Sequence, residues 1–168
     1  MCSSDLTDSR GRSFDGSMAV AIVGASPQVY AAAMGVDSPD KIGAKWLQAE
    51  QNPIKPVTIE AKDAPIKENI LKGDDLAKKG GIDALPVPVV NPGTDSSAYF
   101  SAPIWISKDP DTGVYNAGTY RVMLKAGNRT GVLMMSGQDE RGYWDKYRRL
   151  GKPMPAVLIL TPPPSLAL

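Results

Sequence analysis

An arginine lies within an apolar, β-rich stretch, where a charged side chain needs a partner or a function. Arg121 ends the motif NAGTYR at residues 116–121 and is followed by the apolar run VML. Its guanidinium group can hold a carboxylate through two parallel hydrogen bonds, and it stays charged at any relevant pH. Two interpretations follow from the residue alone. Arg121 binds a carboxylate ligand, or it pairs with a buried acid or extends from an edge strand into solvent.

Asn116 begins the same motif, five positions before Arg121. An odd spacing places two residues on opposite faces of a regular strand. Both side chains could reach one site only if the strand is bulged or twisted between them, or if the site lies at its end. Gly118 is the predicted position of such a bulge.

The composition excludes several common kinds of site. The chain has no histidine, which removes the usual general base and the commonest metal ligand, so no Ser-His-Asp or Cys-His arrangement can form. No cluster has zinc-site spacing. Cys2 is the single cysteine, which rules out an internal disulfide framework. A net charge of +1, from 19 basic and 18 acidic residues, gives no electrostatic argument for nucleic acid or for an anionic membrane.

No apolar run approaches the ~20 residues that a membrane-spanning helix needs. The run at residues 18–23 is much shorter, and no signal peptide precedes it. With a single cysteine, these features suit a reduced compartment, and we expect a cytoplasmic protein. The hydrophobic fraction, 42% of 168 residues, is sufficient for a packed core.

The first part of the chain mixes helix and strand signals. Ser26 and Pro27 form an N-cap and a first helical position, and Gly35 ends that helix. Ser38 and Pro39 form the same N-cap and first helical position for a second helix, which Pro53 ends. The remaining expected elements are strands at residues 18–24, 57–61 and 65–71, and a charged connection at 73–81 that forms the best domain boundary.

The second part reads mainly as antiparallel strands. Two β-rich runs flank the turn at residues 109–113, the second of them covering 114–124, and a third run at 130–136 follows a turn at 126–128. We expect these three strands to form one meander. An extended segment at 85–90 precedes them, and a helix at 138–150 and an apolar strand at 155–160 follow. Tyr143, Tyr147 and Leu150 share one face of that helix.

These motifs, taken in order, resemble the UbiD-type decarboxylases, which use a prenylated flavin. The resemblance covers residues 18–168 and rests on an ordered series rather than on one decisive motif. The series is GDD at 73–75, LPVP at 85–88, the run at 99–106, KDPDTG at 108–113, NAGTYR at 116–121, TG at 130–131 and GKPMPAVLIL at 151–160. Residues 1–6 look foreign to it, and the tail at 1–17 is expected to be disordered or an artefact.

The resemblance implies an α+β chain in which a mixed α/β part, residues 18–81, is followed at 82–168 by part of a split β-barrel of the flavin-reductase type. It implies a carboxy-lyase acting on an aromatic or α,β-unsaturated carboxylic acid. The cofactors would be prenylated FMN and a divalent metal, Mn²⁺ or Mg²⁺, with K⁺ as a further cation. A flavin prenyltransferase would supply the flavin, and the intact protein is expected to be a homo-oligomer.

The resemblance also assigns roles to residues. Arg121 would hold the substrate carboxylate and face the flavin. Asn116 would bind the metal at the flavin phosphate; alternatively, its amide only forms hydrogen bonds with neighbouring backbone groups. Thr119 and Gln138 complete the predicted cofactor-binding set. Gln138 and Asp139 stand where the family usually has a Gln-His pair, so Asp139 is the second expected metal ligand, with Gln138 as an alternative if the register slips by one. Asp139 could equally be the N-cap of the helix at 138–150.

Family members are longer, and their acid/base glutamates fall beyond residue 168. We therefore expect a fragment that is inactive alone and whose unpaired apolar strands promote aggregation. Two other classes remain open: a complete small flavin-binding or accessory subunit without catalytic activity, and a β-barrel binding module that holds no flavin.

Overall fold

The computed structural model describes residues 23–163, residue 166, and four residue pairs near the N-terminus. These pairs form short antiparallel ladders, β1 (Cys2–Ser3) with β4 (Ser17–Met18) and β2 (Leu6–Thr7) with β3 (Ser13–Phe14). The predicted tail at 1–17 otherwise lies outside the described residues. So does most of the strand expected at 18–24, whose described end is a 3₁₀ turn, η1 (Val23–Ala25).

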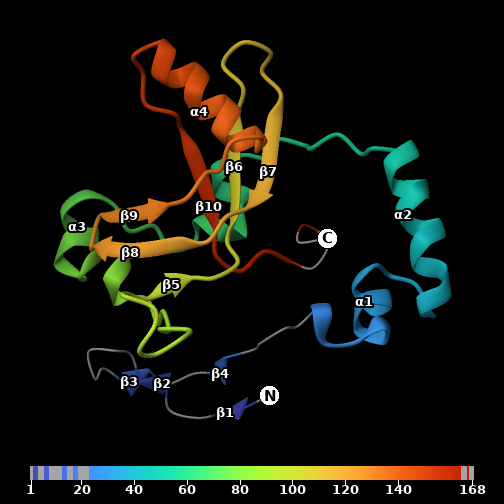
Figure 1. Cartoon of the computed structure of the whole chain (residues 1–168), viewed down its shortest axis with the longest axis horizontal. Helices are drawn as coiled ribbons and strands as arrows, with labels where there is room; N and C mark the ends of the chain where they lie inside the picture. Colours follow the sequence, from blue (N-terminus) through green and yellow to red (C-terminus); the bar gives the residue numbers. More distant parts are fainter. Residues whose placement is uncertain are drawn as a thin grey trace.

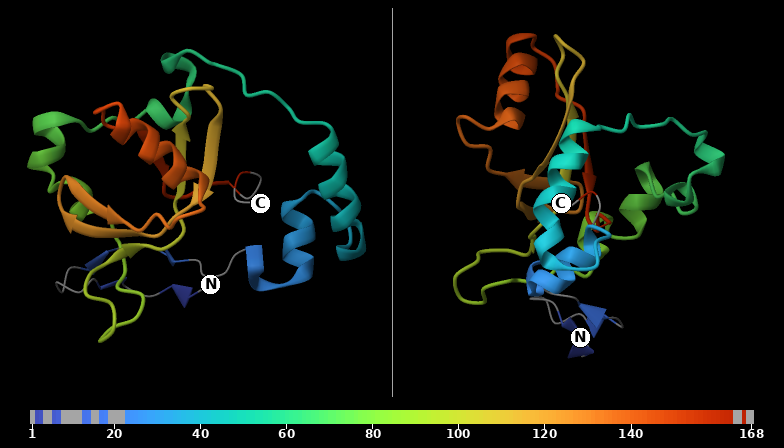
Figure 2. Two further views of the ribbon diagram at one scale, coloured as in Figure 1. Left: turned by 45° about the horizontal axis from the view of Figure 1, so that its top comes forward. Right: turned by 90° about the vertical axis from the view of Figure 1, so that its right-hand side faces the viewer.

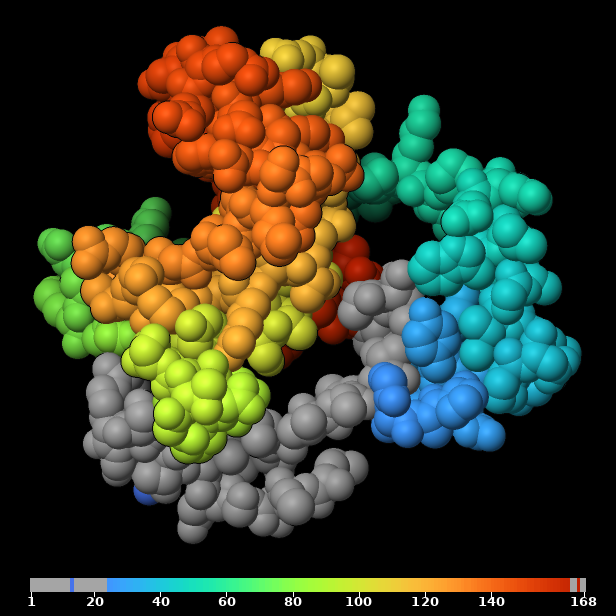
Figure 3. All heavy atoms as spheres, viewed as in Figure 1, coloured from blue at the N-terminus to red at the C-terminus, as the bar shows by residue number. Residues whose placement is uncertain are grey.

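The two predicted helices form where the capping signals place them. Ser26 caps α1 (Pro27–Ala33) by accepting a hydrogen bond from the backbone N–H of Val29 at 3.2 Å. Gly35 ends the helix with φ at 70°, a conformation that favours glycine. A 3₁₀ turn, η2 (Pro39–Lys41), leads into α2 (Ile42–Gln51). Both helices lie apart from the sheets, joined to them by an extended segment (Figures 1 and 2), and Figure 3 shows them as a separate lobe.

The strands expected at 57–61 and 65–71 are wrong. Residues 53–60 are extended but pair with no strand among the described residues, and the 3₁₀ turns η3 (Ala61–Asp63) and η4 (Pro65–Lys67) follow. Ile54 is 94% exposed. β-Branched residues such as Val57 and Ile59 favour strands, but such propensity produces a strand only where a neighbouring strand offers hydrogen bonds. The predicted connection at 73–81 contains a short helix, α3 (Gly73–Lys78), and leads into η5 (Gly81–Ala84).

The expected single meander is divided between two three-stranded antiparallel sheets (Figure 1). In the first, β6 (Ile104–Lys108) lies between β7 (Tyr115–Thr119) and β10 (Ala156–Ile159). In the second, β8 (Val122–Ala126) lies between β5 (Tyr99–Phe100) and β9 (Arg129–Val132). The predicted strand at 114–124 is therefore two strands, which belong to different sheets.

The break between β7 and β8 falls at Tyr120 and Arg121, and Gly118 permits it. A Cβ atom at Gly118 would lie 2.6 Å from the ring of Tyr120, so only glycine lets this ring fold back over the strand. The bulge expected at Gly118 is wrong, because Gly118 pairs with Trp105 in an unbroken ladder between β6 and β7. The chain instead turns a corner at residues 120–121 and passes from one sheet to the other. Both sheets are open, and the flavin-reductase-like split barrel stays a prediction.

The last helix, α4 (Asp139–Arg149), packs against β6 and β7 (Figure 1). It confirms the predicted helix, but Gln138 occupies the N-cap position and Asp139 is already helical, so Asp139 as N-cap is wrong. The buried apolar side chains are few and lie mainly in the strands: Ala31, Val87, Ile104, Val122 and Leu124. Within the described part of the chain, no helix is long and apolar enough to cross a membrane.

Candidate functional site

Asn116 lies in a buried polar cluster between the first sheet and α4. Ser107 and Asn116 are directly opposite each other on β6 and β7, and Glu140 reaches them from the first turn of α4. The Ser107 hydroxyl donates to Glu140 Oε2 at 2.7 Å, and Asn116 Nδ2 donates to the same oxygen at 3.0 Å. Glu140 is fully buried, with 0% of its surface exposed. Three separate elements therefore meet at one carboxylate.

Among the residues that the structure describes, two buried polar atoms in this region have no hydrogen-bond partner: Glu140 Oε1 and the indole Nε1 of Trp105. Trp105 precedes Ser107 by two residues on β6, so both face the same side of the sheet. Buried polar groups are nearly always hydrogen-bonded, and exceptions require an explanation. The α4 side of β6 thus retains one unused acceptor and one unused donor.

The donor set of this cluster suits a hard cation. Asn116 uses its amide nitrogen towards Glu140, so its amide oxygen is left for another partner. Amide and carboxylate oxygens are the ligands that Mg²⁺ and Mn²⁺ prefer. Among the described residues, no group of three or more His, Cys, Asp or Glu side chains could hold a metal ion. A cation held by the Asn116 amide oxygen would therefore need further ligands, such as the oxygens of a phosphate.

Arg121 is held at the corner between the sheets by two neighbours. Its Nη2 lies 2.8 Å from Asp95 Oδ2, and its guanidinium carbon lies 3.8 Å from the centre of the Tyr99 ring. The Arg121 side chain remains 44% exposed, whereas that of Asp95 is 10% exposed. Stacking on an aromatic face leaves the in-plane N–H groups of an arginine free to bind.

Asp95 is itself fixed by its own loop. Its Oδ2 accepts hydrogen bonds from the backbone N–H and the side-chain amide of Asn91, at 3.0 and 3.3 Å. Burial raises the pKa of Asp95, but the hydrogen bonds from Asn91 and Arg121 outweigh it and hold that pKa below the ordinary 3.8. Ser97 donates to the carbonyl oxygen of Leu124 on β8 at 2.7 Å, which anchors the loop. The pair is therefore ionised and held in place from both sides at neutral pH.

A third cluster joins α4 to the turn between β6 and β7. Lys146 Nζ lies 2.7 Å from Asp109 Oδ2 and 3.2 Å from Asp111 Oδ2. Hydrogen bonds from Lys146 and from the backbone N–H of Asp111 lower the pKa of Asp109 from 3.8 to about 2. Its partners are all within the chain, so we regard it as a structural clamp that holds α4 in position over Asn116.

We expect Asp109→Asn to remove most of the loss of unfolding free energy that this cluster causes at acidic pH. A carboxyl group whose pKa is lowered on folding stabilises the folded state above its unfolded pKa, and this contribution is lost as pH falls from 3.8 towards about 2. Urea unfolding at pH 6 and at pH 2.5 measures the loss. Asp111→Asn is the matched control, because Asp111 is 61% exposed and should change the pH dependence less. Equal pH dependence of wild type and Asp109→Asn would contradict the assignment.

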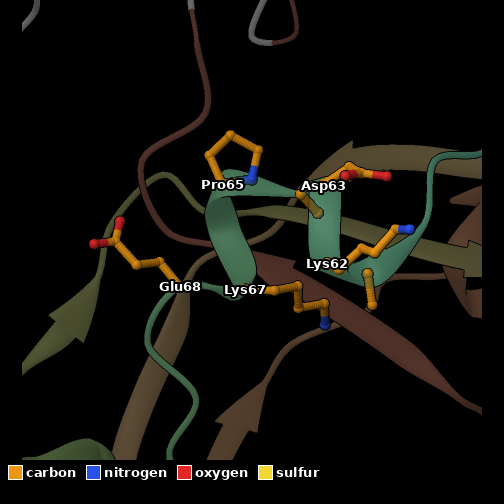
Figure 4. A pocket seen from close by; sticks show the side chains of 7 residues that line it. Lys62, Asp63, Pro65, Lys67 and Glu68 are labelled. Atoms are coloured by element: carbon orange, nitrogen blue, oxygen red, sulfur yellow. The ribbon is translucent and has the colours of Figure 1, made fainter.

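A shallow hollow on the surface, formed by the turns η3 and η4, carries no site (Figure 4). Its charged side chains are of both signs, Lys62 and Lys67 with Asp63 and Glu68, and Figure 4 shows Lys67 and Glu68 pointing in different directions. None of the residues expected to bind cofactor or metal lines it.

The part of the chain that carries these clusters matches a known protein family. The family model described as the UbiD 3-octaprenyl-4-hydroxybenzoate carboxy-lyase Rift-related domain matches residues 57–168. The chain belongs to the UbiD family. The UbiD match contains all three polar clusters and the whole of each three-stranded sheet, and it leaves out α1 and α2.

Solved UbiD structures share this fold. The UbiD-class enzyme HmfF from Pelotomaculum thermopropionicum, in complex with FMN, superimposes with a TM-score of 0.72 at 28% identity, over 81% of this chain and 29% of the enzyme. An evolved dimeric form of HmfF, in complex with prFMN, superimposes equally well, with a TM-score of 0.72 at 28% identity, over 81% of this chain and 30% of that one. The phenolic acid decarboxylase of Sedimentibacter hydroxybenzoicus is 25% identical over 124 residues, which are 71% of this chain and 24% of the relative. The chain thus spans about a quarter of that UbiD relative's length.

The site residues expected from the UbiD resemblance are not brought into one cluster. Asn116 contacts Glu140, whereas Arg121 contacts Asp95 beyond the corner. Thr119 ends β7 opposite Ile104 and is exposed. Asp139 is exposed in the first turn of α4. Gln138 Oε1 accepts a hydrogen bond from the backbone N–H of Met135 at 2.7 Å, and so folds back on its own loop.

Sequence reasoning missed Glu140, Ser107 and Asp95. A signal for Glu140 was present, because Glu140, Tyr143 and Tyr147 are spaced as one face of a helix, the face expected to be buried. No local signal marks Ser107 or Asp95, since each acquires its partner from a segment more than 20 residues away in sequence. Of the two interpretations of Arg121, pairing with a largely buried acid is present in this UbiD chain.

Proposed function

We propose that this chain is the flavin-binding part of a UbiD-type enzyme that removes or adds the carboxyl group of an aromatic or α,β-unsaturated acid. Prenylated FMN would be the cofactor. The observation that carries the proposal is the state of Arg121, which is fixed by Asp95 and Tyr99 and yet remains 44% exposed. A fixed, part-exposed guanidinium is suited to orienting a carboxylate.

The relatives support this choice of substrate and cofactor. One is named as a phenolic acid decarboxylase, and HmfF structures hold FMN or prFMN. These names favour an enzyme over the alternative, a non-catalytic flavin-binding or accessory subunit.

Each cluster has a distinct role in the proposed reaction. Arg121 holds the substrate carboxylate, and Asp95 and Tyr99 keep the guanidinium plane in one orientation. The Asn116 amide oxygen would hold Mn²⁺ or Mg²⁺ together with the flavin phosphate, with Thr119, Gln138 and Asp139 as further proposed contacts and K⁺ as a further cation. The bound flavin supplies an electron sink when the bond to the carboxyl carbon breaks.

The remaining parts of the proposal concern the whole protein. Residues 82–168 would contribute part of a split β-barrel, and residues 18–81 part of a mixed α/β domain. A decarboxylase needs a positioned acid to protonate the carbon that loses carbon dioxide. We propose that this acid lies outside the chain, so that the 168 residues alone release no carbon dioxide. A flavin prenyltransferase would supply the cofactor, and the intact enzyme would be a homo-oligomer.

Flavin retention tests the proposal. Protein coexpressed with a flavin prenyltransferase should purify with flavin absorbance, and Asn116→Ala should lower the flavin retained per protein by about 10-fold or more, because it removes a metal contact. The matched control is Asn128→Ala in the exposed turn after β8, which should retain flavin as wild type does. Colourless wild-type protein, with or without added FMN and Mn²⁺, would contradict the proposal and favour a binding module that holds no flavin.

A further inference from the structure

We infer that Glu140 is a positioning residue, which fixes the side-chain amide of Asn116 so that its oxygen, and not its nitrogen, is presented to a cation. The inference rests on the proposed function for the identity of that cation. It goes beyond the expected site, in which Glu140 had no role and Asp139 was the acidic partner of Asn116.

Hydrogen-bond partners set the orientation of the Asn116 side-chain amide. The two ends of an amide have nearly the same shape, so hydrogen-bond partners decide which end faces which way. A carboxylate oxygen accepts hydrogen bonds and donates none. Because Glu140 Oε2 lies 3.0 Å from the Asn116 amide, the nitrogen must be the end that faces Glu140. The oxygen therefore lies on the other side of the amide.

Ser107 makes this arrangement more rigid. Its hydroxyl donates to the same Oε2 at 2.7 Å, and only 3% of Ser107 is exposed. β6 and β7 pair through Ser107 and Asn116 themselves, so both donors reach Glu140 from adjacent strands. On β7 the even-numbered residues are the more buried ones, which keeps the Asn116 side chain on the α4 face. The carboxylate thus has one oxygen fixed by two donors.

A purely structural role would not explain why this position holds a carboxylate. Burying a carboxylate is costly, and an uncharged side chain of the same size would pack α4 against the sheet without that cost. The position of Glu140 in the first turn of an 11-residue helix lowers the cost, because the N-terminal end of a helix favours negative charge. Its Oε1 is nevertheless buried and has no hydrogen-bond partner in the described part of the chain. A group that accepts only, and so prevents Asn116 from rotating by half a turn, is what the positioning role requires.

Glu140→Gln tests the inference, because glutamine has the same size but can donate as well as accept. We expect this variant to weaken Mn²⁺ binding by roughly 10–100-fold, as loss of a residue that orients a metal ligand commonly does. Mn²⁺ in the presence of FMN, which supplies the phosphate, is the probe. Its binding is measured from the free-ion electron paramagnetic resonance signal, and FMN retention is measured in parallel. The Tm of Glu140→Gln should stay close to that of wild type.

The matched control is Ser107→Ala, which removes the other hydrogen bond to Glu140 and leaves the Asn116 contact in place. It should lower the Tm and weaken Mn²⁺ binding much less than Glu140→Gln does, because Glu140 still accepts from Asn116. Nuclear magnetic resonance of the metal-free wild-type protein gives a readout independent of binding. The Asn116 side-chain amide signals should show one proton protected by the carboxylate, and Glu140→Gln should lose that protection.

The outcomes separate this inference from the proposed function. Wild-type Mn²⁺ affinity in Glu140→Gln, or unprotected Asn116 amide protons in the wild type, would overturn the positioning role. If Asn116 is protected but the wild type binds neither Mn²⁺ nor FMN, the proposed function fails, and the orientation of Asn116 by Glu140 stands.

Discussion

Arg121→Ala is expected to lower carbon dioxide release by about 10²-fold or more in the proposed enzyme, while flavin binding stays measurable. The reason is geometric: Asp95 and Tyr99 hold the guanidinium group at the corner between the sheets, and the exposed part of its fork would orient the substrate carboxylate. A hydrogen bond to a charged group contributes roughly 1.5–3 kcal/mol before orientation is counted. Carbon dioxide release and bound flavin, measured on the same preparation, separate the two effects.

Two further variants make this test specific. Arg121→Lys should restore little activity, because an ammonium group cannot reproduce the planar fork or its stacking on Tyr99. Arg149→Ala, at an exposed position near the end of α4, is the matched control for loss of positive charge and should behave as wild type. Near-normal turnover in Arg121→Ala would mean that this arginine only neutralises Asp95. A rise in the pKa of Asp95 should accompany Arg121→Ala in either case, since Arg121 is one of the groups that lower it.

Local signals in the sequence predicted local structure well. Ser26 with Pro27, Gly35 and the turn at 109–113 each determine the backbone within a few residues, and each forms where it was expected. The division of the strands between two sheets was not predictable in this way, because residues 114–124 read as one continuous β-forming run. The corner at Tyr120 depends on a contact between that ring and Gly118 and on pairing with β5 and β6, which are distant in sequence.

In the candidate site, too, the sequence revealed residues with local signals and missed those whose partners are distant in sequence. Arg121 and Asn116 were found because a charged or amide side chain in an apolar strand is visible in the sequence. Their partners were not, because Asp95 comes from a loop and Glu140 from a helix that only the folded chain brings near. Asp139, adjacent to Glu140, was chosen because it aligns with a family ligand. One residue along a helix rotates the side chain by about 100°, which moves it from the solvent-facing to the sheet-facing side.

Gly81→Ala is expected to lower the free energy of unfolding by about 3–5 kcal/mol, from a strained backbone and an overlap between chain segments. Gly81 is buried at the start of η5 with φ at 68°, a conformation that L-residues rarely adopt. A Cβ atom there would overlap the carbonyl group of Gly127, in the turn between β8 and β9. The same carbonyl accepts a hydrogen bond from Ile82 at 2.8 Å, so relieving the overlap would break that bond. Urea unfolding followed by circular dichroism measures the loss.

Gly80→Ala separates the overlap from the backbone strain. Gly80 also has positive φ, at 88°, but a Cβ atom there would meet only Ala84 Cβ, at an ordinary 3.6 Å. Its cost should therefore be the conformational one alone, about 1–2 kcal/mol. Equal losses in the two variants would mean that the contact between η5 and the β8–β9 turn contributes nothing. A larger loss for Gly81→Ala would show that this turn, which continues from the strand after Arg121, is held in place by the segment at 80–84.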